Sequence, residues 1–514
     1  MSEPEHPSTG APESPSGLAR IVIRGASMSA AGLVVSQGLN FVFYLVLARL
    51  ATPEDFGIVA GAAVIVGAAL LFAESGLVSA VIQREEGVEE AANTALVATV
   101  LSGLALGVVS LALSPLVGAF FDSRETGLAA AAMSGFLVIR AATLIPDGLM
   151  RRRFSFVRRL VVEPGAVIAF GAVAITLCAQ GYGFWGLVIG QYASVLVQFV
   201  LTWSLARWRP NLRLASFSMW RELAGFGRHL ILADAVQQIA TAIPTALIGR
   251  YVSIGALGQY RYASRFASQP FAVLLNSASF VLFPALSRIT RDPPRFRAAF
   301  VRSLRWIAVM ALPSGFVFLP LGEPLLVLLL GEEWRPAGIA LMAMFAYTSA
   351  RCFDSLATEA IIAWGEPRVV ARMHLIGLGL TAVLMISFLP FGLVGVAAGL
   401  SLSAVGVAVY AMMAVCRRIE LPLSRAFAEI WPPALAATVM TAAMLALEHL
   451  LLDADGRSAT VGVVFLALEI LVGAVVYLGA LGLLRPARLR DLFEGATRVM
   501  GGLRRRVGRS AAVE

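Results

Sequence analysis

RGASMSAAGLVVSQGLNFVFYLVLARLATPEDFGIVAGA, residues 24–62, is followed 201 positions later by a stretch of the same organisation, GFGRHLILADAVQQIATAIPTALIGRYVSIGALGQYRYA, residues 225–263. Each is an apolar run that ends in a small residue plus arginine, and a short turn and a glycine follow. The aligned pairs include Gln37 with Gln238, Arg49 with Arg250, and Gly57 with Gly258. We interpret each copy as the first helix of one lobe of a two-lobed membrane protein, with a binding cavity between the lobes.

Composition places the chain in the membrane. The 514 residues are 58% hydrophobic and only 14% charged, and the mean hydropathy is +0.80. Soluble domains keep about a quarter of their residues charged. Apolar runs of about 20 residues, long enough to cross the hydrocarbon layer of a bilayer, recur along the whole chain. The sequence therefore predicts an all-α polytopic membrane protein.

The remaining composition excludes several classes. The net charge of +9 comes from arginines that lie between apolar runs, so no nucleic-acid partner is expected. The three cysteines, Cys178, Cys352 and Cys416, lack the spacing of a zinc site or a disulfide framework. The first residues are acidic and rich in proline and serine without an apolar core, which is typical of a disordered tail and not of a signal peptide.

Counting apolar runs gives fourteen helices. The first six, 27–50, 57–82, 93–118, 128–149, 160–179 and 185–205, belong to an N-terminal lobe at 20–205 that follows the tail at 1–19. An arginine-rich segment at 206–227 reads as an amphipathic linker at the cytoplasmic membrane surface. The next six, 228–250, 264–287, 302–321, 337–363, 371–390 and 392–415, form a C-terminal lobe at 228–420. Two further helices, 428–451 and 460–484, lie within 421–485, before a basic cytoplasmic tail at 486–514.

The arginines predict the orientation. With a cytoplasmic N-terminus, most of the 41 arginines fall in cytoplasmic segments, as positive-inside insertion produces. Fourteen helices then place both termini in the cytoplasm.

Signals of catalysis are absent from the sequence. The four histidines are scattered, there is no ATP-binding motif, and Gly181-Tyr182-Gly183 lacks the preceding Thr-Val of a potassium filter. We therefore expect neither an enzyme nor a channel, and no cofactor or metal. Any coupling would use H⁺ or Na⁺.

Charges inside the apolar runs are the candidates for coupling or gating, because an ionisable group in hydrocarbon usually faces a cavity or a partner. These candidates are Glu74, Asp234, Arg351, Asp354 and Glu359. Arg351 and Asp354 are three residues apart and can pair along one helical face, either as a structural pair or as part of the cavity.

A second set of candidates would bind substrate. Arg49, Arg250, Arg261 and Arg265 lie near the outer ends of their helices, together with Gln37 and Gln238 on the repeated helix. The arginines could anchor the helices at the membrane interface. The repeated placement of Arg49 and Arg250 favours a cationic patch that lines the cavity.

The chain resembles the bacterial polysaccharide transporters, the Wzx-type lipopolysaccharide-biosynthesis branch of the multidrug/oligosaccharidyl-lipid/polysaccharide exporter superfamily. The motifs that carry the resemblance are, in order, Phe56-Gly57, FAESGLVSAVIQRE (72–85), RRRFSF (151–156), GYGFWGLVIGQ (181–191), ARWRP (206–210), FPALSRI (283–289), LGEEWRPAG (330–338) and GLVGVAAGLSLS (392–403). The chain departs from the family where Glu74 replaces a frequent aspartate.

The resemblance implies two six-helix lobes with two extra helices, and a transporter that flips undecaprenyl-pyrophosphate-linked oligosaccharide for exopolysaccharide, capsule or O-antigen synthesis. A polysaccharide polymerase and export machinery are the implied partners. A drug/cation antiporter of the same superfamily and a peptidoglycan-precursor flippase stay open. A polytopic glycosyltransferase or ligase is disfavoured, because the outer loops are short.

Overall fold

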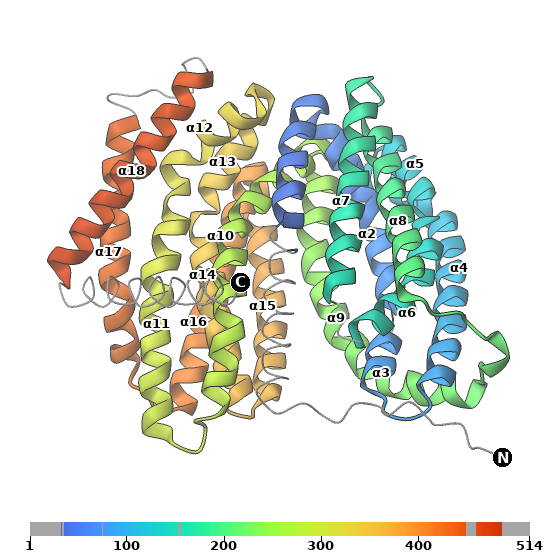
Figure 1. Ribbon diagram of the computed structural model, residues 1–514. Helices are drawn as coiled ribbons and strands as arrows, with labels where there is room; N and C mark the ends of the chain where they lie inside the picture. The colour runs from blue at the N-terminus through green and yellow to red at the C-terminus, as the bar shows by residue number, and fades with distance from the viewer. Residues whose placement is uncertain (1–31, 33–34, 75, 153–155, 449–458, 486–514) are drawn as a thin grey trace, which may run out of the picture. The chain divides into compact units, whose positions relative to one another are not determined.

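The computed structural model describes residue 32 and residues 35–74, 76–152, 156–448 and 459–485, and this part of the chain contains helices and no strand (Figure 1). The expected tails at 1–19 and 486–514 lie outside the described residues. The chain divides into two compact units between Gln238 and Ile239, inside helix α9.

In the first unit, a helix at Val35–Leu50 precedes the labelled elements. These are α2 (Pro53–Glu74), α3 (Leu77–Gln83), α4 (Val88–Phe121), α5 (Arg124–Met133), α6 (Phe136–Arg152), α7 (Phe156–Ala179), α8 (Phe184–Ala206) and the short η1 (Leu212–Leu214). Helix α9 (Phe217–Tyr251) begins in this unit and ends in the second.

The second unit continues with α10 (Ile254–Ser287), α11 (Pro293–Phe316), α12 (Phe318–Leu330), η2 (Glu332–Trp334), α13 (Arg335–Ala343) and α14 (Phe345–Ala363). It ends with α15 (Pro367–Phe388), η3 (Leu389–Phe391), α16 (Gly392–Arg418), α17 (Leu423–Leu447) and α18 (Ala459–Leu484). Buried side chains of α11, α14, α16 and α17 form its core.

The predicted helices follow this order, and the all-helical fold class is confirmed. Four of the fourteen expected runs are broken helices: α2 with α3, α5 with α6, α11 with α12, and α13 with α14. At the first break Gly76 has φ +68°, and at the third the two helices bend by 50°. The count of fourteen is thus approximate.

By length and composition, eight helical stretches among the described residues can cross a membrane, or nine if the bent pair α11–α12 is one span. One of the eight, 368–418, contains both α15 and α16, which pack against each other. Helix α14 is outside the count, since three charged residues lower its hydropathy. The chain is a multi-pass membrane protein.

The repeated stretch has the same local structure in both units. The first helix ends at Leu50 and α2 begins at Pro53, while α9 ends at Tyr251 and α10 begins at Ile254. The hydroxyl of Thr52 accepts a hydrogen bond from the N–H of Asp55 (3.3 Å). Ser253 accepts the equivalent bond from Ala256 (3.0 Å). Each hydroxyl caps the N-terminus of the helix that follows, so the repeat extends to the capping residue.

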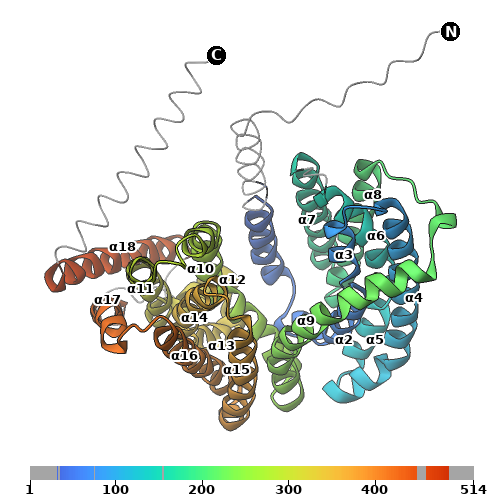
Figure 2. The same ribbon diagram turned by 90° about the horizontal axis from the view of Figure 1, so that it is seen from below.

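The segment after α8 is held on the first unit. The side chain of Asn93 accepts a hydrogen bond from the N–H of Asn211 (2.7 Å), and the hydroxyl of Thr94 accepts one from Ser216 (3.1 Å). Helix α9 begins at Phe217, earlier than the expected residue 228, and its Met219 and Leu223 pack into the core formed by α3, α4 and α6. Figure 2 shows the start of α9 lying across the ends of α3 and α4. The surface role expected for 206–227 stays a prediction.

Candidate functional site

The face that α14 turns toward α10 carries the charged pair expected from the sequence. Arg351 Nη1 lies 3.1 Å from Asp354 Oδ2, which confirms that the two residues pair along one helical face. The guanidinium of Arg351 also lies over the ring of Phe271 on α10, 5.4 Å from its centroid. Helices α10 and α14 run side by side (Figure 1). Arg351 is therefore held by an acid and an aromatic ring at once.

Two hydroxyls fix α14 in this position. Thr348 donates a hydrogen bond to the carbonyl of Ala267 on α10, and Ser349 donates one to the carbonyl of Ala311 on α11 (2.8 Å). A Cβ added at Gly315 of α11 would lie 2.4 Å from the carbonyl oxygen of Phe345. The close approach of these three helices sets the place of the ion pair.

The ion pair leaves part of Asp354 unsatisfied. Its side chain is buried, and within the described residues its Oδ1 has no hydrogen-bond partner. Thr358, one turn further along α14, also has a buried hydroxyl without a partner. Glu359 is half-buried on the same helix. These groups can accept or donate further hydrogen bonds, whereas no group of three or more metal-ligating side chains occurs among the described residues.

The arginine candidates are placed within their own units. Arg49 and Arg250 are exposed, and each lies three residues before the hydroxyl that caps the next helix. Arg261 is exposed on α10, and Arg265 lies one turn further along it, half-buried. Their gathering into one cationic patch stays a prediction, because Arg49 belongs to the first unit and the other three belong to the second.

The remaining candidates are distributed over both repeated helices and α2. Gln37 is exposed. Gln238 packs closely on α2, since a Cβ added at Gly67 would lie 2.5 Å from its amide nitrogen. Glu74 is the last residue of α2, and Asp234 lies within α9. The side chains of these two acids lie outside the described part of the chain.

Some of the quoted motifs meet in the first unit. Asp55 Oδ1, one residue before Phe56-Gly57, accepts a hydrogen bond from the N–H of Phe184 in the GYGFWG motif (2.7 Å). Arg152, from the arginine-rich motif, donates hydrogen bonds to the carbonyls of Val81, Ile82 and Arg84 at the end of α3. These contacts explain the motifs as joints between helices.

Arg84 also joins α3 to α9. It forms a 2.6 Å ion pair with Glu222, and this hydrogen bond raises the pKa of the guanidinium. The charge of Arg84 is therefore retained at any physiological pH.

Two buried acids are absent from the sequence-based candidates. Glu469 lies in the middle of α18 and Glu448 follows the end of α17, and both are buried. Glu74 was chosen as a candidate because it is an acid inside an apolar run. Glu469 meets the same criterion.

The fold defines a class of protein, the all-helical membrane proteins built of two compact units. A solved structure of "Lipid II flippase MurJ, inward closed conformation" superposes with a TM-score of 0.72 at 18% identity, and covers 90% of this chain and 99% of the other. A multidrug resistance MATE family transporter in its inward-facing conformation superposes with a TM-score of 0.57 at 17% identity, and covers 75% of this chain and 98% of the other. At these identities the likeness shows the fold alone.

The chain belongs to the polysaccharide biosynthesis protein family, whose model matches residues 46–338. It is 29% identical over 327 residues to the succinoglycan biosynthesis transport protein ExoT of Rhizobium meliloti, and the match covers 62% of this chain. It is 26% identical over 324 residues to the lipopolysaccharide biosynthesis protein WzxC of Escherichia coli, and the match covers 61% of this chain. The aligned region spans 64% of the length of each relative.

Proposed function

We propose that the protein flips lipid-linked oligosaccharide repeat units across the inner membrane for the synthesis of a surface or secreted polysaccharide. The proposal rests on two similarities of the same chain, one in sequence and one in fold. Its family and named relatives belong to polysaccharide biosynthesis, and its fold is that of a lipid-linked precursor flippase over 90% of its length. The carrier is undecaprenyl pyrophosphate, and the process is transport without chemical conversion.

The physical demands of the task suit two helical units. A lipid-linked sugar has a polar head that cannot cross hydrocarbon and an apolar tail that need not leave it. A transporter that opens a polar cavity alternately to the two sides of the membrane would pass the head while the tail stays in lipid. In this mechanism Arg49 and Arg250 bind the pyrophosphate, and Arg261, Arg265, Gln37 and Gln238 are further candidates for binding the substrate.

The charges of α14 supply the coupling in this proposal. Asp354 keeps one buried carboxylate oxygen without a hydrogen-bond partner in the described structure, and Arg351 is already engaged with Asp354 and Phe271. A proton or a sodium ion that bound at Asp354 would change the pairing of Arg351. The energy then comes from an ion gradient, with Glu74, Asp234 and Glu359 as further candidates, and no organic cofactor is required.

Deletion of the gene tests the proposal. Cells that lack the protein should stop making the polymer while lipid-linked repeat units accumulate on the cytoplasmic side, because synthesis continues but the head cannot cross. Extraction and mass spectrometry of undecaprenyl-linked sugars measure the accumulation, and a plasmid-borne copy should reverse it. Normal polymer without accumulation contradicts the proposal.

A second candidate is favoured by the fold shared with the lipid II flippase, namely transport of a peptidoglycan precursor. In that case deletion would cause accumulation of lipid-linked peptidoglycan units and loss of cell-wall integrity, with the polymer reduced only as a consequence. Altered drug resistance with normal polymer would instead indicate an antiporter. The same lipid extract distinguishes the three outcomes.

A further inference from the structure

Helix α18 carries a single charged residue, Glu469, between Leu468 and Ile470. The residue is fully buried, at 0% relative exposure, and neither carboxyl oxygen has a hydrogen-bond partner in the described part of the chain. An ionised carboxylate in hydrocarbon without a partner is so unfavourable that such groups take up a proton or bind a cation. Glu469 is therefore expected to carry a bound proton or cation.

The packing of α17 on α18 places a second acid opposite the first. A Cβ at Gly473 of α18 would lie 2.5 Å from the sulfur of Met444 on α17, so these two residues face each other. The two helices are consecutive and antiparallel. One turn after Met444 comes Glu448, and one turn before Gly473 comes Glu469, so the acids lie at the same level on facing sides. Glu448 is buried at 7% exposure, and its charge acts on Glu469.

Among the described residues, no cation from the other helices packed on α18 acts on Glu469. On α12 the charged residue is Glu323, which is ion-paired with Arg335. Helix α11 touches α18 where the Tyr477 hydroxyl donates to the carbonyl of Val309 (2.7 Å). No cationic side chain in the described structure acts on Glu469. The connection at 449–458, with His449 and Arg457, lies outside the described residues.

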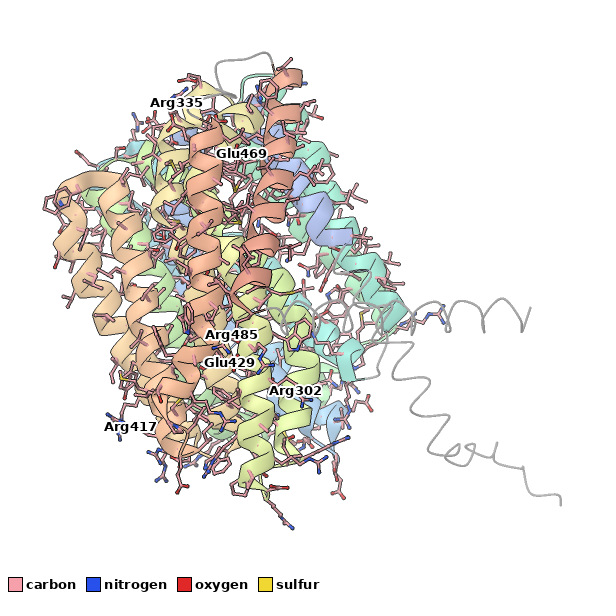
Figure 3. The ribbon with its side chains drawn as sticks, turned by 90° about the vertical axis from the view of Figure 1, so that its left-hand side faces the viewer. Arg302, Arg335, Arg417, Glu429, Glu469 and Arg485 are labelled. Carbon is pink, nitrogen blue, oxygen red and sulfur yellow. The ribbon has the colours of Figure 1, made fainter. Side chains whose placement is uncertain are left out.

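Apart from Glu448, the nearest charges on α11 and α17 belong to a separate pair, since Arg305 of α11 binds Glu429 of α17 at 3.0 Å. Glu429 precedes Glu448 by 19 residues on α17, which is about 28 Å at a rise of roughly 1.5 Å per residue. Figure 3 shows Glu469 in one half of the unit, and Glu429 with Arg485 in the other.

We propose that Glu448 and Glu469 form a proton-binding site within the α17–α18 hairpin. One carboxyl group is protonated at neutral pH and donates its O–H to the other, because two like charges close together in a medium of low dielectric constant do not both ionise. No third metal-ligating side chain joins them among the described residues, so a proton is the ligand that this site fits. The hairpin then crosses the membrane with one negative charge fewer than its sequence suggests.

Infrared spectroscopy of the purified full-length protein in lipid vesicles tests the site. The carbonyl stretch of a protonated carboxyl group should be present at neutral pH, shift in D₂O, and disappear only under alkaline conditions. Glu469→Gln should remove a signal equal to one carboxyl group per protein. Glu429→Gln is the matched control and should leave that signal unchanged, because Glu429 belongs to a separate ion pair with Arg305.

A spectrum of the wild-type protein without the protonated signal at neutral pH would overturn the proposal, and so would its persistence in Glu469→Gln. Loss of the signal on addition of sodium chloride at constant pH would also overturn it, in favour of a cation site. If Glu469→Gln does not fold, Asp354→Asn separates the two buried acids: a protonated signal that persists in this variant supports the site, and its loss overturns it. Since no substrate is used, the outcome is independent of the flippase proposal.

Discussion

At the scale of the residue, Arg49 and Arg250 occupy the same position in two copies of one capped turn. A guanidinium can hold pyrophosphate oxygens through paired hydrogen bonds in a fixed fork, and each contact to a charged group is worth about 1.5–3 kcal/mol. Arg49→Ala or Arg250→Ala should therefore reduce polymer export at least tenfold, because about 1.4 kcal/mol is a factor of ten. Export is measured at matched protein level.

Two further variants sharpen this test. Lysine at either position should restore part of the export if charge alone matters, and little if the fork is needed. Arg213→Ala removes an exposed arginine from η1 and is the control, with export expected to be unchanged. Full export by the double alanine variant would leave Arg49 and Arg250 as interface anchors.

At the scale of the element, Asp55 joins the N-terminus of α2 to the start of α8. Its carboxylate accepts hydrogen bonds from the N–H of Phe184 (2.7 Å) and from the N–H of Thr52 (3.0 Å), so the α7–α8 loop is fixed to the turn before α2. Asp55→Ala should reduce the free energy of unfolding by about 1–3 kcal/mol, because it leaves these donors unpaired. The Tm of the purified protein measures the loss.

Glu54→Ala is the matched control for Asp55→Ala. Glu54 precedes Asp55 on α2 and is exposed, so the Tm of the Glu54→Ala variant should stay near that of the wild type. Gly183→Ala should resemble Asp55→Ala, because Gly183 has φ +53° and a Cβ there would lie 2.7 Å from Asp55 Oδ1. Equal Tm values for Asp55→Ala and Glu54→Ala would show that the joint adds no stability.

The elements also show how far local sequence carries the fold. Hydrophobic runs predicted the order of the helices, and the spacing of Arg351 and Asp354 predicted their ion pair. The breaks inside four runs were not predicted, since apolar residues lie on both sides of Gly76 and continue through the bend after Phe316. The proposed Glu448–Glu469 pairing depends on the register between α17 and α18. This register follows from the contact of Gly473 with Met444 and cannot be deduced from the sequence of either helix.

At the scale of the whole molecule, the arginine distribution predicts cytoplasmic termini. A reporter fused at Gly181, in the α7–α8 loop, should read periplasmic, and one after Arg295, at the start of α11, should read cytoplasmic. Paired alkaline phosphatase and fluorescent fusions measure the two sides. A cytoplasmic signal at Gly181 would contradict both the orientation and the fourteen-span topology.

The binding site as a whole was less predictable than the order of the helices. The candidates Arg49 and Arg250 came from an internal repeat, which the capped turns support at the level of local structure. Their approach to each other depends on how two separately packed units are arranged, and a repeat within one chain carries no such information.

Helix α18 has a consequence for how the protein enters the membrane. Its fifteen Leu, Ile, Val and Phe residues contribute about −5 to −9 kcal/mol on the scale of translocon insertion, against roughly +3 kcal/mol for a charged residue at the helix centre. Helix α18 can therefore be inserted by the translocon before Glu448 is beside Glu469 or a proton is bound. The apolar residues of α18 thus outweigh the cost of Glu469 during membrane insertion.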